Sequence, residues 1–188
     1  PSQVVDADRR VTLGGVDLHS WVTNAAGFNF HNWYGFGKVD ADLAVAAAAI
    51  FDQALLGTQS TQERLAEFTT PVQIPNAEGR SASINLTAGA GTLGIVEFIR
   101  LKIKFSASQA VALNDIGITL TSPSGTTHSV LQPFTNVSGQ PSFYWAIGVA
   151  GFYGETVEGD WEVTIFDYSD DAISPGTWDG FELEVHYR

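Results

Sequence analysis

Gly154–Asp167 reads G-E-T-V-E-G-D-W-E-V-T-I-F-D, a glycine-punctuated turn followed by a regular alternation of apolar and polar residues. Trp161, Val163 and Ile165 fall on one face of an extended chain, because successive side chains of a strand point to opposite faces. The same period of two occurs in Arg100–Phe105 and in Phe181–Tyr187. These runs predict antiparallel strands with one face buried and the other in water.

Further runs of this kind, separated by Gly, Pro, Asn and Asp, fill most of the chain after about residue 70. We expect about eight strands, near residues 72–74, 82–87, 95–105, 116–121, 127–131, 143–149, 161–167 and 178–187. This number and spacing predict a mainly β fold, an antiparallel β-sandwich of the jelly-roll type, preceded by a short α-helical segment.

The helical segment is expected at Lys38–Leu56, which reads K-V-D-A-D-L-A-V-A-A-A-A-I-F-D-Q-A-L-L. Asp40 suits the N-cap, alanine is the best helix former, and Gly57 suits the position just after the helix. The spacing of Val39, Leu43, Ile50 and Ala54 predicts one packed face. Residues 58–70 are expected to form a linker, with at most one helical turn.

Charge and composition narrow the class of protein. The chain has 188 residues, a formal net charge of −12 and no cysteine, so disulfides and thiol chemistry are excluded. No Lys or Arg occurs between Phe105 and Tyr187, where eleven Asp and Glu occur. Such a surface repels phosphate backbones and anionic lipids, so we expect neither nucleic acid nor a membrane as partner. The chain also lacks Met, which indicates a processed or truncated piece of a longer protein.

A second motif gives the β region a family resemblance. Asn114–Thr126 reads N-D-I-G-I-T-L-T-S-P-S-G-T. Together with Gly154–Asp167 it resembles the P-domain (homo B domain) of kexin-like and furin-like serine proteases. The resemblance implies a β-jelly roll that is not catalytic and that stabilises a subtilisin-type catalytic domain of the same protein. One departure is that Phe181 stands where the family has Trp, and Trp178 where it has Leu. We expect the two aromatics to exchange core volume.

The N-terminal part carries its own resemblance. His31–Ala41, H-N-W-Y-G-F-G-K-V-D-A, is similar to the end of a convertase-type subtilase catalytic domain. The implied domains are a catalytic-domain tail over residues 1–57, a linker over residues 58–70 and a P-domain over residues 71–188. In this family the catalytic Ser lies upstream of the motif. The resemblance thus implies the non-catalytic C-terminal part of a secreted endopeptidase, located outside the cell or in the periplasm.

Aspartates near the end of one strand are the best candidates for a metal site. Asp167, Asp170 and Asp171 would repel one another unless they are solvated or bridged by a cation. Neighbouring loops could add Asp115, Glu155 and Asp160. Carboxylate oxygens suit Ca²⁺, and the resemblance favours this ion. The alternatives are an Asp-rich turn whose side chains bond local amides and, for Glu155, a buried structural carboxylate.

Two other functions stay open at this point. Exposed aromatics such as Tyr144 and Tyr153 would suit a carbohydrate- or surface-binding jelly-roll module, or the interface with the catalytic domain. A free-standing hydrolase is remote, because no Ser sits in G-x-S-x-G and no H-E-x-x-H occurs. His31 is expected to be buried and hydrogen-bonded, and His186 to face water.

Overall fold

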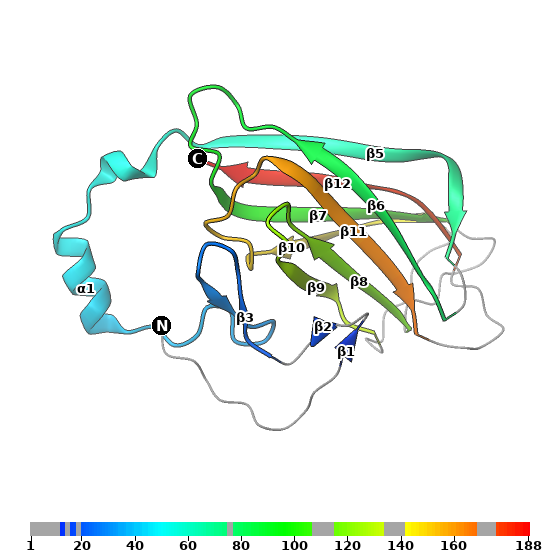
Figure 1. Cartoon of the computed structure of the whole chain (residues 1–188), viewed down its shortest axis with the longest axis horizontal. Coiled ribbons are helices and arrows are strands. Elements are labelled where there is room, and N and C mark those ends of the chain that lie inside the picture. The colour runs from blue at the N-terminus through cyan, green and yellow to red at the C-terminus, as the bar shows by residue number, and fades with distance from the viewer. Residues whose placement is uncertain are drawn as a thin grey trace.

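Two antiparallel sheets, stacked face to face, make up the body of the molecule (Figure 1). The structure is a computed structural model that describes residues 12–13, 16–17, 20–74, 77–106, 115–133, 142–168 and 176–188. The predicted class is confirmed: the chain is mainly β, with a two-sheet sandwich and one short α-helix.

The first sheet has the strand order β10-β7-β12-β5. Its members are β10 (Ser142–Val149), β7 (Val96–Ser106), β12 (Thr177–Tyr187) and β5 (Ser60–Gln73). The second sheet has the order β6-β11-β8-β9, with β6 (Gly79–Leu86), β11 (Gly159–Asp167), β8 (Ile116–Thr121) and β9 (Thr127–Leu131). Seven of these strands match the predicted runs to within a few residues.

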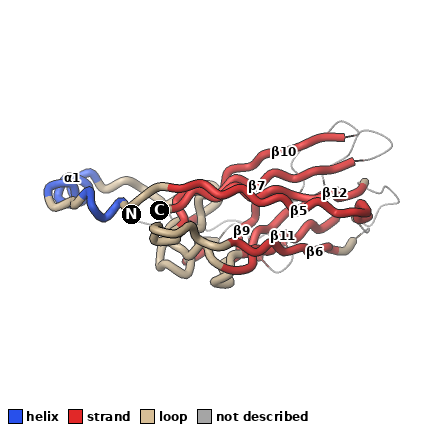
Figure 2. Tube along the Cα trace, turned by 90° about the horizontal axis from the view of Figure 1, so that it is seen from above, coloured by secondary structure: helices blue, strands red, loops and turns tan. Residues whose placement is uncertain are grey.

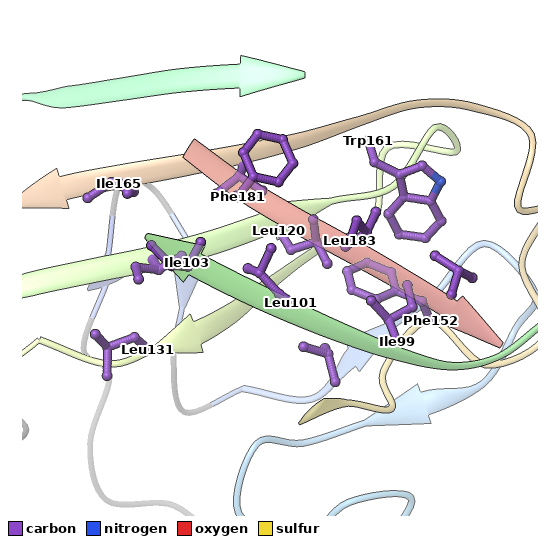
Figure 3. Close-up of a cluster of buried hydrophobic side chains, with 14 of the residues drawn as sticks. Ile99, Leu101, Ile103, Leu120, Leu131, Phe152, Trp161, Ile165, Phe181 and Leu183 are labelled. Atoms are coloured by element: carbon purple, nitrogen blue, oxygen red, sulfur yellow. The ribbon is translucent and has the colours of Figure 1, made fainter. Parts of the chain in front are cut away.

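The core lies between the sheets and takes one face from each. Figure 3 shows Leu101 and Leu183 of the first sheet near Leu120 of the second, with Trp161 and Phe152 at one end. Trp161 is fully buried, and its indole N–H donates to the carbonyl of Val157 at 3.0 Å. The alternation that predicted the strands therefore also identified their buried faces.

The two exchanged aromatics both lie in this core. Trp178 and Phe181 are almost fully buried and stack with their centroids 5.9 Å apart. A register shift between Trp178 and Gly180 turns the strand so that both rings point inward. Gly180 is required there, because its φ is +148° and an added Cβ would lie 2.2 Å from the carbonyl oxygen of Ala66.

The structure differs from the expected linker over residues 58–70. Residues 60–73 form β5, which pairs with β12 from Ser60 opposite Tyr187 to Gln73 opposite Thr177. Ala66 and Phe68 pack against the core, whereas Glu63 and Glu67 face water. The few large apolar residues made this edge strand resemble a polar connection, because an edge strand with one wet face needs little apolar surface.

The helix is shorter than expected and is not packed. It comprises α1 (Ala41–Ala49), and a separate 3₁₀ turn η1 (Gln53–Leu56) follows. The predicted cap is confirmed, since the Asp40 side chain accepts from the amide of Leu43 at 3.0 Å. A second cap at Asp52 accepts from the amide of Ala54 and begins η1, so the helix does not reach Gly57.

No packed face forms on α1, contrary to the expectation. Every residue of α1 is exposed, and Val39 and Ile50 beside it are 79% and 86% exposed. Figures 1 and 2 show the helix standing away from the sandwich. None of the described helices has the length and apolar character needed to cross a bilayer.

Two small hairpins complete the described N-terminal part. They are β1 (Thr12–Leu13) with β2 (Val16–Asp17), and β3 (Val22–Thr23) with β4 (Asn29–Phe30). The second hairpin and the turn after it lie against one end of the sandwich (Figure 1). We call residues 22–30 the N-terminal hairpin.

Candidate functional site

The two P-domain-like motifs meet at one end of the sandwich. The S-P-S-G-T turn joins β8 to β9 and is closed by a bond from the amide of Gly125 to the carbonyl of Ser122 at 2.9 Å. Its last residue, Thr126, donates its hydroxyl to Oε1 of Glu155, in the loop before β11. Glu155 is only 2% exposed. The buried carboxylate therefore links two segments that lie far apart in the sequence.

The N-terminal hairpin completes this link through Asn24 and Ala25. The amide of Ala25 donates to Oε1 of Glu155 at 2.9 Å. The side-chain amide of Asn24, which is 3% exposed, donates to the carbonyls of Gly151 and Tyr153 at 3.0 and 2.8 Å. Buried polar groups that find partners in this way fix one geometry, because leaving any of them unpaired is costly. We call Asn24, Thr126 and Glu155 the junction.

The sequence analysis missed Asn24, although a local signal was present. Asn24-Ala25-Ala26-Gly27 is a tight turn in which Gly27 has φ +84° and donates to the carbonyl of Asn24. The side-chain oxygen of Asn24 also accepts from the amide of Phe28 at 2.9 Å. Asn followed three residues later by Gly is typical of such turns. The turn leaves the side-chain N–H₂ group pointing at the sandwich.

Aromatic rings pack beside the junction. Phe28 meets Tyr153 edge to face with centroids 5.1 Å apart, and Phe36 meets Tyr153 at 6.0 Å. Gly154 allows this approach, because a Cβ there would lie 2.7 Å from the ring of Phe28. A cavity of about 440 Å³ opens beside these rings and is lined by Gly27, Phe28, Asn29, Phe36 and Tyr153.

His31 has the structural role that was expected. It is 1% exposed, and its Nδ1 accepts from the amide of Trp33 at 3.0 Å. Reciprocal backbone bonds of 2.8 Å join His31 to Gly35, where φ is +58°. The ring packs on Tyr34 with centroids 4.7 Å apart. The H-x-x-Y-G motif is therefore a compact turn that contains its own histidine.

His128, in contrast, lies under the N-terminal hairpin. It is 2% exposed and meets Phe30 and Phe152 edge to face at 5.3 and 4.9 Å. Burial lowers the pKa of His128, while the backbone of Gly151 and the charge of Glu155 act in the opposite direction.

The four candidate metal ligands that the structure describes do not form one site. Glu155 belongs to the junction, and Asp160 is exposed and accepts from the side-chain amide of Asn85 at 2.8 Å. Asp160 and Asp167 are seven residues apart on β11, which separates them by roughly 23 Å in an extended strand. Asp167 is buried, and the amide next to it, of Tyr168, donates to the carbonyl of Asp115. Asp115 and Asp167 are thus neighbours, while Asp170 and Asp171 lie outside the described residues.

Another group of carboxylates lies on the outer face of the first sheet. Oxygens of Glu63, Glu182 and Glu184 come within 4.8 Å of one another. Nζ of Lys102 contacts all three, at 3.9 Å from Glu63, 3.2 Å from Glu184 and closest to Glu182. Because Lys102 and Arg100 already pair with these carboxylates, the cluster is an ion-pair network.

The titration of this network follows from its contacts. Burial alone would raise the pKa of Glu182, but bonds from Lys102 and Tyr144 lower it overall. The pKa of Glu184 is lowered in the same way by His186 and Lys102, against the effect of burial. Burial and the bond to Glu182 raise the pKa of Tyr144 to about 12. His186 lies on this outer face, as expected, with Nε2 2.8 Å from Glu184.

The aromatics considered for carbohydrate binding have separate surroundings. Tyr153 is covered by Phe28 and Phe36 of the N-terminal part. Tyr144 is 46% exposed, but its hydroxyl donates to Glu182 at 2.8 Å and Nζ of Lys104 lies 5.8 Å from its ring centroid. The two residues therefore do not share one platform. Of these features, the junction is the one that connects the N-terminal hairpin to the sandwich.

Comparison with known proteins places these features in context. The family model for the proprotein convertase P-domain matches residues 97–185. The chain is 27% identical over 167 residues to proprotein convertase subtilisin/kexin type 5 of Rattus norvegicus. It is 28% identical over 163 residues to the Aeromonas extracellular serine protease of Aeromonas sobria. These alignments cover 85% and 80% of this chain, but only 9% and 25% of those two proteins.

A solved structure shares the fold. The crystal structure of the serine protease of Aeromonas sobria superposes with a TM-score of 0.74 at 21% sequence identity. The superposition covers 92% of this chain and 34% of that chain. Since 92% is more than the sandwich alone, the shared fold extends into the N-terminal part.

Proposed function

Because residues 97–185 are the P-domain of a subtilisin-like proprotein convertase or serine protease, we propose that this chain is the non-catalytic C-terminal portion of a secreted kexin-like endopeptidase. Its sandwich stabilises the catalytic domain and assists its folding. The relative from Aeromonas sobria is named an extracellular serine protease, which supports a secreted parent protein. Residues 1–57 would then be the end of the catalytic domain.

The junction carries this proposal. If residues 20–37 belong to the last part of the catalytic domain, the bonds from Asn24 and Ala25 attach that domain directly to the sandwich. Any partner that binds only the folded state stabilises it, and a covalently attached partner is always present. If the C-terminal end of the catalytic domain unfolded, Glu155 would become exposed and would lose its hydrogen bond from the amide of Ala25. The sandwich therefore raises the free energy of unfolding of the domain before it.

The exposed helix is consistent with this role. Ala, Leu and Val surround α1 on nearly all sides, and such helices are normally enclosed by protein. Leu43 and Val45 are 66% and 72% exposed in this chain. Under the proposal the rest of the catalytic domain covers them, while the junction holds the segment before the helix on the sandwich.

The test compares Glu155→Gln with Glu158→Gln in the full parent protease. Glu155→Gln keeps the volume and the oxygen that accepts two bonds, but it removes the charge and buries an N–H₂ group where Oε2 has no partner, which costs about 1–3 kcal/mol. Glu158 is exposed in the same loop, so it is the matched control. We expect Glu155→Gln to lower the temperature at which peptidase activity is lost, and Glu158→Gln to leave it unchanged. Equal heat inactivation of both variants and the unaltered protein would contradict the stabilising role.

We further propose a Ca²⁺ site at the Asp115–Asp167 end of the sandwich. Its support is that Asp167 ends β11 and Asp115 directly precedes the adjacent strand β8, and that Asp170 and Asp171 follow Asp167 closely in the sequence. Carboxylates on neighbouring strands are ligands that suit Ca²⁺. Glu155 and Asp160 are not part of this site, because each has other partners.

A further inference from the structure

His128 is a buried titratable side chain to which the proposed function gives no role. It projects from β9 and is enclosed by Phe30 of the N-terminal hairpin and Phe152 of the sandwich. Among the described residues, its Nε2 has no hydrogen-bond partner. A neutral imidazole tolerates such surroundings far better than a charged imidazolium, which needs water or an acceptor.

The backbone leaves little room for a new partner. A Cβ at Gly151 would lie 2.4 Å from Nε2 of His128, so the chain packs directly on the ring. Phe30 and Phe152 present ring carbons on the other contacts. The backbone of Gly151 favours the charged ring, but its carbonyl already accepts from Asn24 at 3.0 Å. A protonated ring could therefore gain a further partner or water only if one of the covering groups moved. Gly151 and Phe152 lie in the loop between β10 and β11, and Phe152 is fully buried in the core, whereas Phe30 of the hairpin is only partly buried, so the hairpin is the covering group that can move away.

The titratable groups around His128 are few. Glu155 is the charged group that acts on it, and Oε1 of Glu155 is already engaged by Ala25 and Thr126. The N-terminal hairpin carries no titratable side chain, and His31 follows it. The loop before Glu155 carries Tyr153, and β8 carries none. Two further strands contact β9: β2, which carries Asp17, and β10, which carries Tyr144.

We propose that His128 is a proton-operated latch for the N-terminal hairpin. When the imidazole is neutral, Phe30 covers it and the hairpin stays docked on the sandwich. When the imidazole takes up a proton, the hairpin is released so that the ring can reach water. The latch belongs to this chain itself, so it would stand even if the stabilising role failed.

The direction of the effect follows from linkage. Burial lowers the pKa of docked His128 below the ordinary value near 6.5, which applies once the hairpin is released. Below pH 6.5 the released state therefore binds more protons than the docked state. Docking is complete above pH 6.5 and weakens as pH falls, until pH passes the docked pKa. In this window the equilibrium constant for release rises by up to about tenfold per pH unit.

Hydrogen exchange of the whole chain tests the latch. The amide of Ala25 bonds Thr126 and Glu155 of the sandwich, and so is bonded in this way only while the hairpin is docked. Its protection factor, corrected for intrinsic exchange, is measured between pH 7.5 and 5.5. We expect it to fall by about tenfold across this range. Amides of β11, in the centre of the second sheet, should keep theirs.

Two variants separate His128 from other histidines. His128→Gln removes the proton site, so hairpin protection should no longer depend on pH. His186→Gln removes a half-buried histidine on the outer face of the first sheet and should retain the dependence of the unaltered chain. If His128→Gln keeps that dependence, or if the unaltered chain shows none, the latch is refuted.

A direct titration covers the case in which His128→Gln fails to fold. The ring protons of His128 in the unaltered chain report its own protonation by NMR. We expect a midpoint below 6.5, accompanied by release of the hairpin. A midpoint at or above 6.5 while the hairpin amides stay protected would overturn the proposal.

Discussion

Two stretches of the N-terminal part, residues 22–37 and residues 39–56, meet the sandwich in opposite ways. In the first, Asn24 and Ala25 donate to buried residues of the sandwich, the carbonyl of Gly151 and the carboxylate of Glu155. In the second, Leu43, Ile50 and Phe51 are more than half exposed. The stretches follow one another directly in the sequence, so chain connectivity alone does not produce docking.

The difference lies in where each stretch finds partners. Residues 22–37 form turns whose polar groups are matched by carbonyls and a carboxylate of the sandwich, so docking is directional. Residues 39–56 offer apolar surface without a facing apolar patch among the described residues. Apolar surface is driven out of water but does not select one geometry. Residues 22–37 are thus structurally part of the sandwich, whereas α1 needs a separate partner to cover its apolar surface.

Removing Trp161 is expected to have the largest effect. Trp161→Ala empties a fully buried site beside Phe152 and should destabilise the chain by about 3–5 kcal/mol. The sandwich and residues 22–37 should lose protease resistance together, as followed by limited proteolysis with mass spectrometry. Trp33→Ala, at a site 53% exposed, is the control and should change little. If the sandwich lost protease resistance while residues 22–37 kept it, the two would not form one folding unit.

Calcium should act on the sandwich without acting on the junction. At a hundredfold excess over Kd, a ligand of the folded state adds roughly 2.7 kcal/mol, which should raise the melting temperature by several degrees. Asp115→Asn with Asp167→Asn should abolish the rise, and Asp160→Asn, at the other end of β11, should not. Calorimetry with and without chelator measures this. Identical melting curves would remove the calcium site.

A pair of glycines measures how tightly the first stretch is docked. Gly125 and Gly154 both have φ +86°, but a Cβ at Gly125 meets nothing within 4 Å, whereas one at Gly154 would meet Phe28 at 2.7 Å. Each change to Ala pays about 1–2 kcal/mol for the left-handed backbone. Gly154→Ala should cost about 1–2 kcal/mol more, from overpacking. Urea unfolding measures the loss in free energy of unfolding for each variant. Equal losses would mean that the Phe28 side chain moves aside at no cost.

The smallest effect is expected in the helix. Leu43→Ser replaces a side chain that is 66% exposed, so the free energy of unfolding should change by about 0.5 kcal/mol or less. Residues 39–56 should be cleaved first by a nonspecific protease in both forms. A loss above about 2 kcal/mol would show that α1 packs on the sandwich, and the contrast between the stretches would disappear.

Strand prediction worked where each strand carried strong alternation. Alternation correctly predicted the buried face of β11, with Trp161, Val163 and Ile165, and that of β7, with Leu101 and Ile103. β5 was missed because its contribution to the core is modest and its outward Glu63 and Glu67 suggested a polar connection. The helix was drawn too long because alanine favours helix as far as Ala49, while the cap at Asp52, which begins a new turn, outweighed the apolar spacing.

The candidate site was harder to foresee from local patterns. Glu155 was recognised as either a metal ligand or a structural carboxylate bonding loop amides, and the structure places it with the amide of Ala25. Asn24 was not predicted, because nothing near it in the sequence shows the partners of its side-chain amide, the carbonyls of Gly151 and Tyr153.

The sequence alone determined the core faces of the strongly alternating strands and the cap that begins the helix, because these depend on periods of two and on residues a few positions apart. Only the tertiary structure brought Ala25 to Thr126 and Glu155, across sequence separations of 101 and 130 residues. It also left α1 without cover. Contacts of this range depend on how two complete sheets stack, and no local pattern encodes that arrangement.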